Sequence, residues 1–274
     1  MMTTMKTRQE IKALARDAMS EQRGTAILLG FVYLAVSFVF GLVTSGIGGI
    51  GAVIGVTWLY HVVNLGGSLV ITVMGINLLG EYIKIYKRQQ ADVGAMFSEL
   101  SVNFLRKLGG SLLLGLVGAL FVGVAAGLSV AVGNIAYLLV LLAIPVSLRL
   151  YFTMNILADC PEVRAHEALG CSMKITSGHS WAIFVFLLSW IGWFLLCIPT
   201  FGILYLVYVG PYWYTADAGF YLEMRDEAIA NGRITRKELG LPEEDFINED
   251  NNSGGGWNNN PRGGSGWDDY SRRN

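Results

Sequence analysis

Three long stretches of this chain contain no Asp, Glu, Lys or Arg: 24–80, 108–148 and 175–216. A helix that crosses the roughly 30 Å hydrocarbon core of a bilayer needs about 20 apolar residues at about 1.5 Å each, and every stretch exceeds that length. Soluble folds rarely contain charge-free stretches of this length. The sequence therefore predicts an all-α, polytopic membrane helical bundle.

Composition supports this class. Of the 274 residues, 53% are hydrophobic and 15% charged, and the net charge of −1 averages a charge-poor core with charge-rich segments. We therefore expect no nucleic-acid partner, and the lipid bilayer is the partner that the composition predicts. Residues 1–22 lack the basic and apolar regions of a cleavable signal peptide, so the first span is expected to remain as an anchor.

Six spans result when the apolar stretches are divided at polar, Gly and Pro breaks: 24–44, 64–84, 109–131, 134–154, 180–198 and 202–221. The Gly-rich segment 45–63 is read as an outer loop, an interfacial helix or a re-entrant segment, because Trp58 and Tyr60 favour the headgroup level. A seventh span is the alternative for this segment.

The basic residues provide a test of the six-span topology. They gather in the N-terminal segment, between spans two and three, between spans four and five, and after span six, whereas the three outer connections carry no charge. Lys and Arg favour the cytoplasmic side, so both termini are expected in the cytoplasm. The predicted organisation is an N-terminal amphipathic helix (1–23), a bundle (24–222) and a C-terminal linker and disordered tail (223–274).

The inner segments carry helical patterns of their own. Thr7 and Glu10 form a capping box, and Asp159 with Glu162 suggests another, opening a loop helix 160–177 with Gly178 at its C-terminal cap. A further helical repeat covers residues 93–108. These segments predict three amphipathic helices that form a collar on the inner face.

Beyond about Asn248 the chain is dominated by Asn, Gly and Ser. Such a sequence buries too little apolar surface to offset its ordering entropy, and disorder is predicted. The alternative is that Trp257 and Trp267 in this tail contact a partner.

Arg149 and Asp217 are the charged residues that fall inside the predicted spans away from their ends. Buried charges in a membrane usually pair or line a polar path. One interpretation is an intramembrane pair between Arg149 and Asp217, in a substrate or ion route. The other is that both side chains extend separately to the inner headgroups.

A ridge of small residues follows one face of the third span: Gly115, Ala119, Gly123, Gly127 and Ala131. Small residues every four positions let a second helix approach closely, so this face predicts tight helix packing. The neighbour is either another helix of this chain or a second copy.

The inner loop after span four contains Cys160, His166, Cys171 and His179, but their spacing matches no zinc pattern. We find no phosphate-binding loop, dinucleotide fingerprint or nucleophile elbow. The sequence predicts no catalytic residues, no metal and no cofactor, and hence a protein that is not an enzyme.

Five runs of sequence carry a family resemblance: Ile156–Pro161, Glu167–Lys174, Gly178–Trp181, Trp190–Trp193 and Pro211–Tyr221. Together they resemble the bacterial membrane family catalogued as domain of unknown function 975, from about residue 5 to 224. The resemblance implies a plasma-membrane location and brings no activity with it. Asp217 and the Asn/Gly-rich tail depart from the family pattern.

Two classes of function remain open. The inner collar, the small-residue ridge and the lack of a chemical motif favour a non-enzymatic scaffold or membrane-assembly protein, with a protein partner or a homo-oligomer. Arg149, Asp217 and the segment 45–63 favour a small-solute or ion transporter instead. A polar cavity that reaches the bilayer midplane would favour transport.

Overall fold

The computed structural model describes residues 6–100, 103–132 and 143–242, and every regular element among them is a helix. The all-α prediction is therefore confirmed. The chain divides into two compact units, Met1–Leu241 and Pro242–Asn274, and every described helix belongs to the first unit. The predicted disordered tail lies outside the described residues.

Two long helices form the first hairpin: α2 (Arg23–Ile54) and α3 (Thr57–Tyr86). They are joined at Gly55, which has a φ of 75° and ends α2 in the left-handed conformation that Gly adopts without strain. The prediction of a separate segment 45–63 is wrong, because these residues continue both helices. Gly is common in membrane helices, so the Gly residues here do not break α2.

The N-terminal helix α1 (Arg8–Glu21) begins as predicted, with a capping box between Thr7 and Glu10. The helical repeat at 93–108 forms only one turn, α4 (Ala95–Ser98), before α5 (Phe104–Val132) begins. The second predicted capping box is wrong. Asp159 ends α7 (Thr153–Asp159), and at the start of α8 (Ala165–Ile175) the Glu167 carboxylate accepts from the backbone N–H of Arg164 at 3.1 Å. Gly178 takes the predicted left-handed conformation, with φ 82°.

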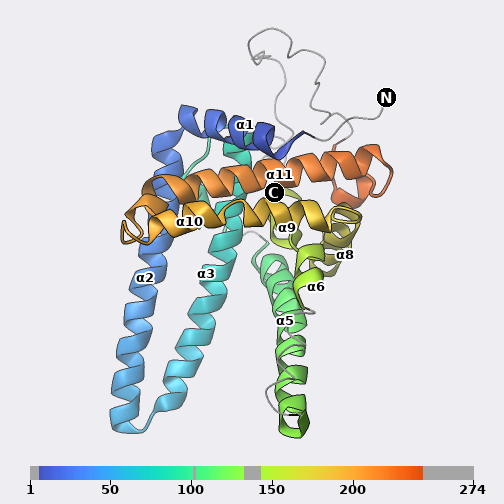
Figure 1. The fold of residues 1–274 in the computed structure, drawn as a ribbon. Helices are drawn as coiled ribbons and strands as arrows, with labels where there is room; N and C mark the ends of the chain where they lie inside the picture. Colours follow the sequence, from blue (N-terminus) through green and yellow to red (C-terminus); the bar gives the residue numbers. More distant parts are fainter. Residues whose placement is uncertain (1–5, 101–102, 133–142, 243–274) are drawn as a thin grey trace, which may run out of the picture. The chain divides into compact units, whose positions relative to one another are not determined.

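The remaining elements are α6 (Ala143–Arg149), α9 (Ser180–Leu188), α10 (Ile191–Cys197), the π-helix η2 (Tyr205–Val209), α11 (Gly210–Ala230) and the 3₁₀ turn η3 (Lys237–Leu239). In Figure 1, α2, α3 and α5 run down the view, whereas α9, α10 and α11 run across it. The helix α1 lies above α11 in the same view.

Among the described residues, four segments are long and apolar enough to cross a membrane: Arg23–Gly51, Thr57–Tyr86, Phe104–Ser129 and Ser180–Cys197. The predicted spans 134–154 and 202–221 are not among them. Residues 133–142 of the first lie outside the described part, and the second is divided between a turn, η2 and the first half of α11.

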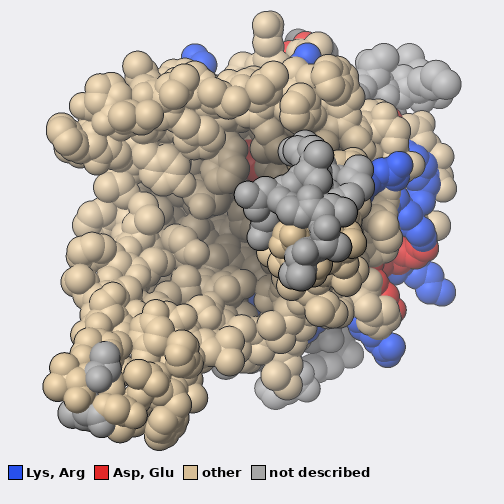
Figure 2. All heavy atoms as spheres, turned by 60° about the horizontal axis from the view of Figure 1, so that its bottom comes forward, with Lys and Arg blue, Asp and Glu red and all other residues tan. Residues whose placement is uncertain are grey.

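The core lies where α1, α3, α7, α8, α9 and α11 meet, and aromatic side chains dominate it. Phe186 stacks on Phe220 with ring centroids 4.4 Å apart, and Phe152 packs against Phe220 and Tyr221, all of them fully buried. Farther along α2 and α5 the large apolar side chains are exposed, for example Phe38 at 67% and Leu116 at 66%. Figure 2 shows this end of the molecule as an almost uncharged surface, hollowed at its centre.

Candidate functional site

Asp217 lies buried on α11 and is held by two neutral donors. The hydroxyl of Tyr151 donates to one carboxylate oxygen at 2.6 Å, and the side-chain amide of Asn155 donates to the other at 3.0 Å. Thr153, on the same turn of chain as both donors, is also fully buried. The carboxylate thus joins α11 to α7 and to the short connection that precedes α7.

The structure does not bring Arg149 and Asp217 together in an ion pair. Arg149 ends α6 and is exposed, and its backbone carbonyl accepts hydrogen bonds from the hydroxyls of Ser172 and Thr176. Within the described residues, the side-chain hydrogen bonds of Asp217 come from Tyr151 and Asn155. Neutral donors therefore satisfy this carboxylate, and the two predicted site residues are separate features.

A second carboxylate, Asp159, lies at the centre of a buried charged cluster. One of its oxygens is 2.9 Å from the Lys87 ammonium, and the other is 2.6 Å from the Arg225 guanidinium and accepts from the Tyr221 hydroxyl at 3.2 Å. The side chains of Asp159 and Arg225 are only 5% and 4% exposed. The cluster ties together the C-terminal ends of α3 and α7 and the second half of α11.

Burial and charge act against each other at this cluster. Burial raises the pKa of the Asp159 carboxyl, but the positive charges of Lys87 and Arg225 outweigh it and hold that pKa below its usual value. Burial likewise raises the pKa of the neighbouring Cys160 thiol to about 12. Cys160 is thus a protonated, unreactive thiol at neutral pH.

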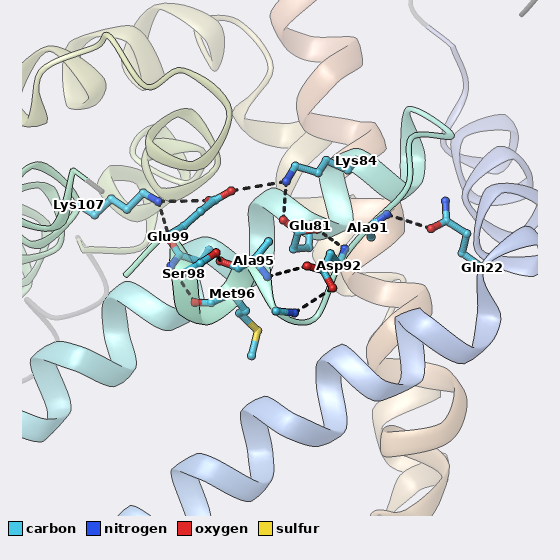
Figure 3. A network of polar contacts seen from close by, with 12 residues as sticks. Gln22, Glu81, Lys84, Ala91, Asp92, Ala95, Met96, Ser98, Glu99 and Lys107 are labelled. Atoms are coloured by element: carbon cyan, nitrogen blue, oxygen red, sulfur yellow. Dashed lines mark hydrogen bonds and ion pairs between the residues drawn. The ribbon is translucent and has the colours of Figure 1, made fainter. Parts of the chain in front are cut away.

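A third polar cluster, drawn in Figure 3, joins α3, α4 and α5. The buried ammonium of Lys107 donates to the side-chain oxygen of Asn77 at 2.5 Å, and the Asn77 amide donates to the Met96 carbonyl at 3.1 Å. Glu99 lies 3.9 Å from Lys107 and 3.6 Å from Lys84. The side-chain oxygen and the side-chain NH₂ group of Asn77 are thus both hydrogen-bonded, and Asn77 fixes α4 against the two long helices.

Glu81 organises the loop after α3 from a side chain that is 1% exposed. One of its oxygens is 2.6 Å from Lys84, and the other accepts from the backbone N–H of Asp92 at 2.9 Å. Asp92 in turn accepts from the backbone N–H of Gly94 and Ala95, as Figure 3 shows. The backbone donors at the start of α4 are thereby satisfied by a side chain.

The predicted packing ridge on α5 meets open space within the described structure. A methyl group added at Gly115, Gly123 or Gly127 would contact nothing within 4 Å, and Ala119 is exposed. The side chain of Ala131 lies outside the described part. The ridge is therefore not packed against another described helix of this chain.

A cavity of about 250 Å³ lies between α5 and α6. Its lining is mainly apolar and includes Leu114, Phe121 and Val146. Tyr151, which donates to Asp217, contributes to its wall. A smaller cavity, of about 30 Å³, is lined by Tyr33, Tyr82 and other residues of α2, α3, η2 and α11.

Residues 124–228 match the family described as "Protein of unknown function (DUF975)". The family resemblance found in the sequence is therefore confirmed over these residues, which run from the second half of α5 to the end of α11. The Asp217 and Asp159 clusters lie largely inside the match. No curated protein and no solved structure matches the chain.

Within the described ranges, no group of three or more His, Cys, Asp and Glu side chains could hold a metal ion. Cys160 and Cys171 are buried, and His179 instead lies 3.4 Å from Glu227.

The sequence did not indicate the partners of Asp159, because Lys87 and Arg225 are 72 and 66 positions away from it. A carboxylate beside a helix end was read as a local cap, and only tertiary structure reveals its ion pairs.

Proposed function

We propose that this chain is a non-enzymatic integral membrane protein of the plasma membrane, of scaffold or membrane-assembly type. The observation that carries the proposal is that the buried polar groups connect parts of the fold. Asn77, Lys107, Glu81, Asp159 and Arg225 each join one helix to another or to a loop. Residues committed to such contacts hold a structure together and are unavailable to a substrate.

The orientation proposed for this scaffold places both termini in the cytoplasm, as the distribution of Lys and Arg favours. The polar clusters then form a rigid inner platform on α4, α7, the second half of α11 and the adjoining ends of α3 and α5. The apolar helices α2, α3 and α5 anchor the platform in the bilayer.

The helix α5 is the place where we expect another transmembrane helix to pack. Its ridge at Gly115, Gly123 and Gly127 is open, and the flanking side chains of Leu116 and Leu120 are 66% and 64% exposed. Small residues permit close helix–helix approach in lipid. The occupant is a second copy of this chain or a partner helix.

A photo-cross-linking experiment tests the scaffold. A benzoylphenylalanine at Leu116 on α5 is expected to give a discrete protein adduct in native membranes. The matched control is Phe38 on α2, which is 67% exposed and should cross-link to lipid alone. Adducts with lipid alone at Leu116 and at Leu120 would argue against a scaffold built on α5.

A transporter is the second candidate, and the geometry around Asp217 favours it. Its partner Tyr151 lines the 250 Å³ cavity. Ion flux into proteoliposomes that Asp217→Asn abolishes and Arg149→Met preserves would favour transport. Equal leakage from protein-containing and empty vesicles would favour the scaffold.

A further inference from the structure

The segments α9, α10 and η2 are predicted from the sequence to be parts of two membrane-crossing helices, and their contacts indicate another placement. Their neighbour α11 lies beside α1 along most of its length. The backbone N–H of Lys6 donates to Glu223 at 3.0 Å, and toward the other end of α11 the Tyr212 hydroxyl donates to the Lys12 carbonyl. The Arg16 guanidinium lies 5.6 Å from the Tyr212 ring centroid. The two helices are therefore antiparallel neighbours.

The other side of α11 is covered by α9 and α10 in the same manner. Phe186 stacks on Phe220, Trp190 contacts Tyr212 with centroids 4.9 Å apart, and farther on Trp193 contacts Tyr208. Lys12 of α1 lies 4.4 Å above the Trp190 ring and donates to Ser189 at 2.7 Å. The helices α1, α11 and α9–α10 thus form one layer, which Figure 1 shows running across α2 and α3.

The composition of α1 decides whether this layer crosses the bilayer. Its sequence RQEIKALARDAMSE carries six charged residues among fourteen. Charged side chains near the bilayer centre are strongly disfavoured, so α1 does not cross. A helix that runs antiparallel beside α1 shares its direction, across α2 and α3 and not along them, and Figure 1 shows the same direction for the α9–α10 pair.

The length of α2 places the layer at one surface of the membrane. The small cavity where η2 and α11 meet α2 is lined by Gly30, Tyr33 and Leu34. Beyond it, residues 35–54 extend about 30 Å at 1.5 Å per residue, which equals the thickness of the hydrocarbon core. The layer therefore lies at the inner end of a hairpin whose remaining length spans the core.

The outward surface of α9, α10 and η2 is apolar and uncharged. Trp181 is 74% exposed, Ile198 70% and Phe201 95%, and the whole stretch 175–216 lacks Asp, Glu, Lys and Arg. An exposed apolar surface of this kind marks an interaction site, and its continuity with the spanning helices identifies lipid as the occupant. We propose that the hairpin 180–209 is embedded in the inner leaflet, parallel to the membrane plane, and does not cross the bilayer.

By length and composition alone, the segment Ser180–Cys197 could cross the membrane. The proposal states that it does not cross. It also differs from the six-span topology, in which the tip of the hairpin near Phe201 lies at the outer face. Both arrangements leave the C-terminus inside, so the side of the membrane on which Phe201 lies distinguishes them. The proposal holds for either function considered above.

The experiment uses the full chain with Cys160, Cys171 and Cys197 changed to Ala, and one new cysteine labelled with the fluorophore NBD. The labelled sites are Phe201→Cys and two controls, Val53→Cys at the α2–α3 turn and Lys237→Cys on the inner side, all three at exposed positions. Proteoliposomes are captured through a C-terminal tag, which selects one orientation. Dithionite, which does not cross the bilayer, is then added outside.

We expect dithionite to abolish the fluorescence at Phe201 and at Lys237 and to leave that at Val53 unchanged until detergent is added. Retention of the Phe201 signal together with that of Val53 would place the tip at the outer face and overturn the proposal. Loss of all three signals would also overturn it, because the α2–α3 hairpin would then fail to cross.

Discussion

The proposed orientation divides this molecule into an inner and an outer part, and the two are stabilised by different interactions. In the inner part, side chains such as Asp159, Arg225 and Lys107 are buried and paired between helices. In the outer part, α2 and α5 expose apolar side chains, and the ridge of α5 contacts nothing among the described residues. Tertiary polar contacts therefore define the inner part, whereas the outer part depends on lipid or on another helix for its partners.

The largest expected effect is that of Asp159→Asn. It removes the buried carboxylate from the Arg225 guanidinium, which is 4% exposed and keeps the more exposed Asp226 as a partner, and breaking a buried ion pair costs about 3–5 kcal/mol. Thermal unfolding in detergent measures the loss. The matched control is Asp17→Asn, whose side chain is 74% exposed beside Arg88 and should cost under about 1 kcal/mol. Equal losses for the two variants would contradict the assignment of a buried pair.

Two glycines of α5 sharpen the comparison between its inner and outer parts. A methyl group at Gly110 would lie 2.3 Å from a Leu157 methyl carbon, whereas one at Gly115 meets nothing within 4 Å. We expect Gly110→Ala to destabilise the fold by about 1–3 kcal/mol through overpacking. Gly115→Ala should leave stability unchanged or raise it by up to about 1 kcal/mol. The measurement is the melting temperature of the two variants, which should be lower for Gly110→Ala than for Gly115→Ala. The reverse order would contradict the close packing of α5 at Gly110.

The pH dependence of the Asp159 cluster is a smaller effect. The pKa of Asp159 is lowered in the folded protein, so its stabilisation is complete above the unfolded value of about 3.9 and is lost as pH falls through the lower folded pKa. The difference in melting temperature between the native chain and Asp159→Asn should thus be constant above about pH 5 and narrow below about pH 4. A difference that stays constant to about pH 2 would mean that folding does not lower the pKa of Asp159.

The smallest expected effect is the coupling between Arg149 and Asp217. Arg149 is exposed, and Asp217 is held by Tyr151 and Asn155. In the double-mutant cycle of Arg149→Met with Asp217→Asn, the effects on stability should add within about 0.5 kcal/mol. A coupling well above this value would restore the intramembrane pair predicted from the sequence.

Local patterns were sufficient for the parts of the fold that depend on local interactions. The charge-free stretches predicted the apolar helices, the Thr7 capping box predicted the start of α1, and Gly178 predicted a left-handed residue. The segment 45–63 was read wrongly because Gly residues are a weak sign of a helix end in membrane sequences. Here one left-handed residue, Gly55, makes the whole connection.

The candidate site depends on contacts that periodicity cannot reveal. Asp217 was recognised as a buried charge, but its partners Tyr151 and Asn155 are 66 and 62 positions away and are not charged. The orientation of α9 and α10 was equally hidden, because an apolar helix in the membrane plane and one across the membrane share the same composition. Only the contacts of α11 with the charged helix α1 separate these two arrangements.

The orientation of the inner platform is tested most directly by reporters fused after Asn274. We expect alkaline phosphatase, which is active only outside the cytoplasm, to be silent there, and green fluorescent protein at the same position to be fluorescent. The phosphatase inserted at the α2–α3 turn near Gly55 should be active and serves as the control. An active phosphatase after Asn274 would contradict the cytoplasmic location of the platform.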